Sequence, residues 1–357
     1  MCYIAIFVCT FRLPVTITLF QSGNREAKNL KLNGCSPNIF NLLRALCSAF
    51  FFLLKCSMFL QQLINGLTLG SVYALIALGY SMVYGILELI NFAHGEIYML
   101  GAYLGIIFLA FFTAIGLTSY SLILALVLTF CLSIAFCSSY GFTIEKIAYK
   151  PLRNAPRLSP LISAIGVSIF LQNYVMLTQG ATDKVFPHLF ETGGFQFMSV
   201  RMTHLQLFII LASFVLMIAL RLFVRKTRMG KAMRAVAQDK TMASLVGINI
   251  DTVISVTFII GSGLAAAAGL MVAMYYGLVN YSIGYVAGIK AFTAAVLGGI
   301  GSIRGAMVGG ILLGLVESLG GSYISSEYKD AYAFIILIII LLVKPGGLFR
   351  KAELEKV

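Results

Sequence analysis

The chain has 357 residues, of which 60% are hydrophobic and only 11% are charged, and its formal net charge is +13. Because a soluble protein is typically about 45–50% apolar and about 25% charged, this composition excludes an ordinary soluble globular fold. Most Lys and Arg residues stand between long apolar runs, where they set the orientation of a membrane protein, so the positive charge does not indicate nucleic-acid binding. We predict an all-α polytopic membrane protein in contact with lipid.

Residues 1–57 differ from the rest of the chain. Their apolar stretches are interrupted by charges such as Arg12, Arg44 and Lys55. The first apolar stretch lacks the basic start and the small-residue cleavage site of a signal peptide. Either this N-terminal extension adds membrane-associated segments, or translation starts at Met58 and the extension is not part of the natural protein. We favour the second interpretation.

From Met58 onward, apolar runs of helical length follow one another to the C-terminus. Most provide the roughly 20 residues that a helix needs to cross a bilayer. The run at 286–301 is shorter, with about 16 residues, and is compatible with a half-helix or a re-entrant segment buried in protein. We expect about eight to ten transmembrane helices. Helices are expected at 60–87, 92–115, 119–142, 161–179, 205–224, 252–276, 286–301, 305–324 and 331–349.

Three basic stretches indicate which side of the membrane is cytoplasmic. They cover 146–157, 221–240 and the tail from Lys344. The positive-inside rule places all three in the cytoplasm. The number of crossings between the second and third stretches must then be even, so the segments at 286–301 and 305–324 either both cross or both do not.

Glycines recur at helical spacing in the last third of the chain. Gly301, Gly305 and Gly309 are four residues apart, and so are Gly310 and Gly314. Small residues at this spacing let helix backbones approach closely in a membrane, so we expect a packing role. A flexible hinge that lines a pore is the alternative.

A polar group interrupts the apolar sequence between Leu63 and Phe112. It consists of Asn91, His94 and Glu96. Our favoured hypothesis is structural, with Asn91 and Glu96 capping a helix start at the cytoplasmic end. A buried polar network at a subunit interface or gate, with Glu96 paired to a cation such as Lys290 or Arg304, is a second hypothesis. Direct contact with a transported molecule is a third.

Two further charges, Lys290 and Glu317, stand within apolar runs. Each could extend along its helix to an interface. An ion pair across helices is the alternative. No other spacing predicts a catalytic, metal or cofactor site, because GxxxxGK[ST], HExxH, GxSxG and CxxC patterns are absent from the sequence.

The segment Arg225–Val253 is the most informative part outside the apolar runs. Its first half is basic, and small or apolar residues then recur at roughly helical intervals up to Gly247, which can end a helix. A short helix of this kind lies either on lipid headgroups or in a groove of a partner protein. Its Ala and Met content favours a partner.

Four ordered stretches resemble permease subunits of bacterial ABC importers for branched-chain amino acids, of the LivH type. The stretches are LQQLINGLTLGSVYALIALGYSMVYGILELINFAHGEIYMLGAY, RAVAQDKTMASLVGINIDTV, AGIKAFTAAVLGGIGSIRGAMVGGILLGLVE and SSEYKDAYAFIILIIILLVKPGGLFRKAELEKV. Together they are spread over 58–357, which would form the permease domain. Members of this family begin close to the position of Met58, which is why we suspect a misassigned start.

The resemblance implies a non-enzymatic permease in the bacterial inner membrane, without a cofactor. It implies a second homologous permease, two ATPase subunits and an extracytoplasmic substrate-binding protein that delivers leucine, isoleucine or valine. It also implies an ATPase-coupling helix in the cytoplasmic segment, with matching residues at Arg234, Ala237, Asp239, Ala243 and Gly247. The chain departs from the family pattern at Arg304, where a small residue or Pro is common.

Two alternatives remain open at this stage. Permeases for urea or short amides are similar in sequence and form the nearest alternative within the same class. A stand-alone channel or ion-coupled carrier belongs to a different class. A carrier typically contains an internal repeat, which is not evident here, and would leave the cytoplasmic helix without a partner.

Overall fold

The computed structural model describes residues 37–153, 155–156, 158–187, 193–197 and 200–349. The chain divides into two units, Met1–Phe59 and Leu60–Val357. Most of the N-terminal extension lies outside the described residues, so its origin stays a prediction. The second unit is the helical bundle described below.

The bundle is built from long helices joined by short segments. Its central helices are α2 (Pro37–Leu87, in the bundle from Leu60), α3 (His94–Ala114) and α10 (Ile250–Tyr276). The others are α4 (Leu117–Tyr120), α5 (Leu122–Ile144), α6 (Leu158–Gln179), α7 (His204–Lys226), α8 (Arg228–Gln238), α9 (Lys240–Leu245), α11 (Ile283–Gly298), α12 (Ile303–Tyr323) and α13 (Lys329–Val343). Short antiparallel pairs join β1 (Lys184–Val185) with β4 (Leu278–Val279), and β2 (Gly194–Phe197) with β3 (Val200–Thr203).

The predicted all-α polytopic class is confirmed. Each of the nine expected apolar segments contains a helix, with boundaries shifted by a few residues. Seven helices in the described part of the chain are long and apolar enough to cross a membrane. The expected eight to ten is reached only if the shorter helices α11 and α13, of 16 and 15 residues, are included. At about 1.5 Å per residue, neither matches a hydrocarbon core of about 30 Å.

Burial separates the inner helices from the outer ones. In the most apolar stretches of α2 and of α10, 83% of the residues are buried, whereas 22% are buried in the corresponding stretches of α5 and α6. The sequence of α10 explains its central position, because the run GSGLAAAAG lets neighbouring backbones approach closely. The outer helices instead expose large apolar side chains such as Ile123, Phe170 and Leu177, as expected for surfaces that contact lipid.

The glycines of α12 confirm the packing interpretation. Gly310 and Gly314 lie against α2, where Gly70 has so little space that an added Cβ would lie 2.8 Å from the Cα atom of Ile311. Gly305 and Gly309 lie against α11. Gly301 precedes α12 in a left-handed conformation, with φ of +86°, so it turns the chain between α11 and α12.

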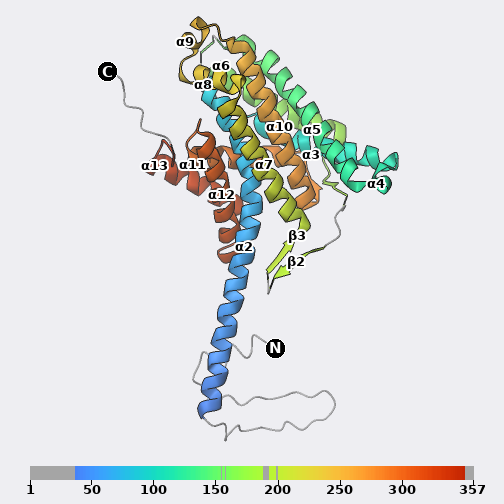
Figure 1. Ribbon diagram of the computed structural model, residues 1–357, viewed down its shortest axis with the longest axis vertical. Helices are drawn as coiled ribbons and strands as arrows, with labels where there is room; N and C mark the ends of the chain where they lie inside the picture. Colours follow the sequence, from blue (N-terminus) through green and yellow to red (C-terminus); the bar gives the residue numbers. More distant parts are fainter. Residues whose placement is uncertain (1–36, 154, 157, 188–192, 198–199, 350–357) are drawn as a thin grey trace. The chain divides into compact units, whose positions relative to one another are not determined.

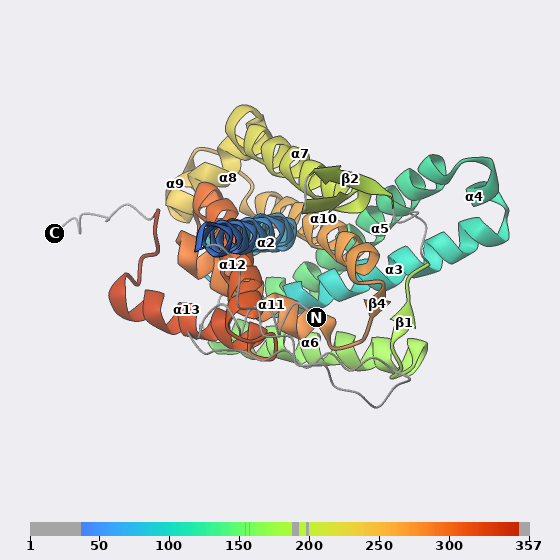
Figure 2. The same ribbon diagram turned by 90° about the horizontal axis from the view of Figure 1, so that it is seen from below.

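The two ends of the bundle differ in character. Figure 1 shows α8 and α9 at one end, and the β2–β3 hairpin near the opposite end. We call the first of these the basic end, because Lys146, Lys150 and Arg153 follow α5 there and the basic helix α8 follows α7. Seen along the bundle in Figure 2, α7 and α6 lie on opposite sides, with α10 and α3 between them.

Candidate functional site

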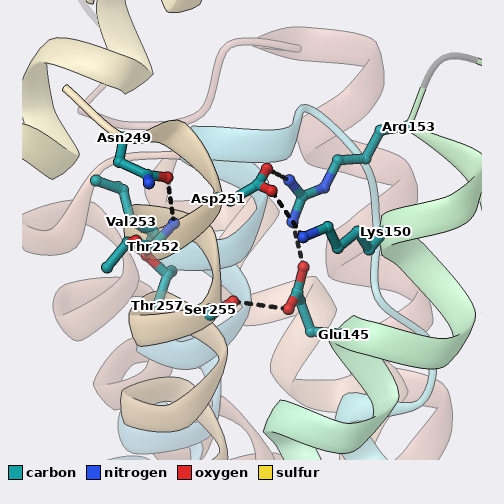
Figure 3. A network of polar contacts seen from close by, with 9 residues as sticks. All are labelled: Glu145, Lys150, Arg153, Asn249, Asp251, Thr252, Val253, Ser255 and Thr257. Carbon is teal, nitrogen blue, oxygen red and sulfur yellow. Dashed lines mark hydrogen bonds and ion pairs between the residues drawn. The ribbon is translucent and has the colours of Figure 1, made fainter. Parts of the chain in front are cut away.

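A network of charged residues joins α5 to α10 at the basic end. The helix α5 continues as a π-helical turn, η1 (Glu145–Tyr149), and a 3-10 turn, η2 (Lys150–Leu152). Opposite it, α10 begins at Ile250, where the Asn249 side chain accepts a hydrogen bond of 3.1 Å from the Thr252 N–H and caps the helix. These two helix ends carry the network in Figure 3.

Arg153 is the centre of this network. Its guanidinium group donates to Glu145 and to Asp251 through different nitrogens, which uses the fork geometry of arginine. Lys150 Nζ lies 2.7 Å from Asp251 Oδ2, and Ser255 Oγ donates to Glu145 Oε2 at 2.8 Å. The Glu145 side chain is 0% exposed. The network therefore neutralises a fully buried carboxylate and ties η1 to the first turns of α10.

This network was not predicted from the sequence, because the basic stretch 146–157 was expected only to determine the membrane topology. The available signal was the acidic Glu145 at the start of a basic segment that directly follows an apolar run. Asp251, the second carboxylate that Arg153 binds, stands 106 positions after Glu145, and only the fold brings the two together.

We expect the two cations of the network to differ strongly in their effect on stability. Replacing Arg153 with Met leaves Glu145 buried without its cation and should cost about 3 kcal/mol. Replacing Lys150 with Met removes an ion pair whose side chains are 40% and 49% exposed, and should cost at most about 1 kcal/mol. Thermal aggregation in detergent, followed by size-exclusion chromatography, measures the difference. Equal losses for the two variants would contradict this assignment.

The polar group at the start of α3 is buried, but it does not cap the helix as expected. The N-cap residue is Ala93, and no side-chain hydrogen bond caps this helix end within the described residues. Asn91 Oδ1 instead accepts a hydrogen bond of 2.7 Å from the Tyr149 hydroxyl, which connects this loop to η1. The capping hypothesis for Asn91 was wrong because a tertiary contact takes the side chain.

Glu96 occupies the first turn of α3 and is 1% exposed. Its Oε1 accepts a hydrogen bond of 3.1 Å from Ser168 Oγ of α6. The suggested pairing with Lys290 or Arg304 was wrong, since Lys290 pairs elsewhere and Arg304 is exposed. His94 is buried beside the ring of Tyr80, with ring centroids 4.8 Å apart.

The second pair of intramembrane charges forms an ion pair. Lys290 Nζ of α11 lies 2.8 Å from Glu317 Oε1 of α12 and 2.7 Å from Asp330 Oδ1 of α13. The side chain of Lys290 is buried and lies 5.8 Å from the ring centroid of Tyr73. The alternative of an ion pair across helices is therefore correct, and this pair holds the short helices α11 and α13 to α12.

The segment Arg225–Val253, expected to contain one short helix, contains two, α8 and α9. Asp239 separates them, and its side chain caps α9 by accepting a hydrogen bond of 3.0 Å from the Met242 N–H. Ala243 is 3% exposed and packs inward, whereas Gly247 turns the chain toward α10 with φ of +84°. The remaining apolar residues of this turn point outward. They are Met242, Leu245 and Val246, with 62%, 75% and 76% exposure.

The other residues predicted for this region lie beside the helix pair. Arg234 and Ala237 on α8 are exposed and line a shallow pocket between α8 and the end of α2. Arg304 at the start of α12 lines a neighbouring pocket, together with Arg234 and two arginines of α7. The structure thus places Arg304 at the basic end, beside Arg234 of the expected coupling segment.

Long apolar helices, an outer surface of large apolar side chains and one basic end define a multi-pass membrane protein. Its family follows from sequence comparison. Residues 62–341 match the model of the branched-chain amino acid transport system permease component, and the chain belongs to this family.

Individual relatives match along nearly their whole length. The chain is 52% identical over 304 residues to the high-affinity branched-chain amino acid transport permease LivH of Salmonella typhimurium, covering 84% of this chain and 98% of the relative. It is 52% identical over 303 residues to LivH of Escherichia coli and 50% identical over 303 residues to BraD of Pseudomonas aeruginosa, with the same two coverages. No solved structure matches the chain.

Proposed function

We propose that this chain is the permease subunit of an ATP-driven importer for branched-chain amino acids in the bacterial inner membrane. It would form half of the translocation pathway beside a second homologous permease. Two ATPase subunits would bind at the basic end, and an extracytoplasmic protein would deliver the substrate. Membership of a family described as branched-chain amino acid transport permeases is the observation that carries this proposal.

The helix α9 is the part of the chain best suited to contact the ATPase subunits. Its exposed apolar residues Met242 and Leu245, and Val246 directly after it, lie outside the apolar bundle. Apolar side chains grouped in this way favour insertion into a groove of a partner protein. The basic charge of α8 would keep the helix pair on the cytoplasmic side.

The expected coupling residues then have separate roles. Asp239 would fix the start of α9, Ala243 would hold the helix against the chain, and Gly247 would redirect the chain into α10. Movement of α9 with the ATPase subunits would reach α10 directly, because only a few residues separate the two helices. Rigid-body movement of this type is one of the standard ways in which proteins switch between states. ATP hydrolysis would take place on the partner subunits and not on this chain.

Co-purification tests the proposed assembly. The chain carries an affinity tag and is purified in mild detergent from its native membranes, and mass spectrometry identifies the proteins bound to it. We expect one second permease for each copy of this chain, and two ATPase subunits for each such pair of permeases. Purification of the chain alone or as a homo-oligomer would contradict the proposal and favour a channel or carrier.

A further inference from the structure

A cavity of about 310 Å³ lies between α6, α11 and α2. This volume is at the lower end of the roughly 300–1,000 Å³ that is usual for small-molecule sites. Aliphatic and aromatic side chains form most of its wall, including Ile165, Ile169, Ile289 and Phe292. Ser168 and Gln172 provide polar groups, and Ser168 lies about halfway along the 22 residues of α6.

Glu96 lies directly behind two residues of this wall. Its Oε1 accepts the hydrogen bond from Ser168, and a Cβ atom built on Gly284 would lie only 2.6 Å from its Oε2. Oε2 has no hydrogen-bond partner among the described residues, although the side chain is almost fully buried. A carboxylate in this environment is costly unless a cation or several donors compensate it. The ion pairs found in the described chain leave Glu96 without a cation.

The opposite charge preference is found at the start of α11. This helix begins at Ile283, and the side chain of its N-cap residue Ser282 does not cap it. Gly284 and Tyr285 in its first turn both line the cavity. Backbone N–H groups at a helix N-terminus favour an anion, and short helices that begin within the membrane are used in this way at transporter sites. The first turn of α11, which favours an anion, thus lines the cavity and also adjoins the buried Glu96 carboxylate, which lacks a cation.

We propose that the cavity is a binding site for a zwitterionic amino acid during its passage through the membrane. The ammonium group would bind Glu96 after the Ser168 hydroxyl turns away, and the carboxylate would bind the first turn of α11. The branched aliphatic side chain would contact Ile169, Ile289 and Phe292. This assignment rests on the proposed function and identifies the residues of this chain that would contact the substrate.

Photolabelling of the assembled importer tests this site. The complex of this chain with its partner permease, ATPase subunits and binding protein is reconstituted in liposomes and supplied with ATP and photo-leucine, a diazirine analogue of leucine. After irradiation we expect labelled peptides that contain Ile169 or Phe292. The variant Glu96→Gln keeps the shape of the side chain but removes its charge, and it should lower both this labelling and the uptake of radiolabelled leucine about tenfold.

Two matched pairs of variants on α6 separate a binding role from a structural one. Ser168→Ala removes the hydroxyl that competes with the ammonium group for Glu96 and should raise labelling, whereas Ser163→Ala, which removes a hydroxyl that donates to the Ala148 carbonyl, should leave it unchanged. Ile169→Trp should fill the cavity and block labelling, whereas Ile162→Trp should not, because Ile162 is exposed and lies outside the cavity wall. Both isoleucines are largely exposed, so these variants test the site even if Glu96→Gln does not assemble.

The outcomes distinguish this inference from the proposed function. If the assembled wild-type complex takes up no leucine, both the proposed function and the assignment of the binding site are wrong. If leucine is taken up but photo-leucine labels other segments, or if Glu96→Gln and Ile169→Trp transport like the wild type, only the site is wrong.

Discussion

Replacing Leu245 and Val246 with Asp should release the ATPase subunits from the purified importer and abolish uptake of leucine. These side chains are 75% and 76% exposed in the isolated chain, so the change does not disturb its core. Anchoring apolar residues of an interface often contribute 2 kcal/mol or more each, and losing two should weaken binding by roughly a thousandfold. Co-purification of the ATPase subunits and uptake into liposomes measure the effect.

A control variant on the same helix distinguishes the loss of the apolar contacts from the effect of an added negative charge. Thr241→Asp introduces one carboxylate into the first turn of α9, where a negative charge suits the helix dipole. This variant should retain the ATPase subunits. Ala243 is unsuitable for such a test, because it is buried and a charged replacement would disturb the chain itself. Retention of the ATPase subunits by the Leu245→Asp, Val246→Asp variant would show that α9 is not the docking element.

Removing the carboxylate of Glu317 should strongly destabilise the bundle. In the Glu317→Leu variant the buried ammonium group of Lys290 keeps only Asp330, whose side chain is 63% exposed. Breaking a buried ion pair typically costs about 3–5 kcal/mol, and we expect a value near the lower limit because Asp330 remains. The temperature at which the detergent-solubilised protein aggregates should fall clearly.

A second substitution should reverse this loss. Lys290→Met combined with Glu317→Leu removes both charges and should return stability to within about 1 kcal/mol of the wild type. Exchanging the charges would be a poor test, because Lys290→Glu would place a carboxylate beside Asp330. Glu327→Leu, at an exposed position before α13, serves as the control and should have little effect. A double variant as unstable as Glu317→Leu would contradict the ion-pair explanation.

Local sequence was sufficient to predict the helices but not the partners of the polar residues. Long apolar runs predict helices because a bilayer requires them, and each expected run contains one. The four-residue spacing of the α12 glycines likewise predicted close packing. By contrast, Asn91 was expected to cap α3, and it contacts Tyr149 instead. The pairing of a polar side chain depends on which helices become neighbours, and no local pattern contains that information.

The site at Glu96 shows the same limit. Its three residues were recognised as unusual from their place in an apolar run, which is a local property. The cavity beside them depends on Ser168 and Gly284, which are 72 and 188 positions away from Glu96. The segment 146–157 shows the reverse error, because its basic character concealed the buried Glu145 next to it.

The bridge formed by Arg153 has a mechanical consequence. Asp251 belongs to the first turn of α10, shortly after α9, and Arg153 holds that turn to the end of α5. A displacement of α9 would therefore move the start of α10 and the end of α5 together. Since Tyr149, the last residue of η1, donates a hydrogen bond to Asn91, the loop before α3 would move as well. A movement of ATPase subunits bound to α9 would thus be transmitted to the buried polar residues Asn91, His94 and Glu96.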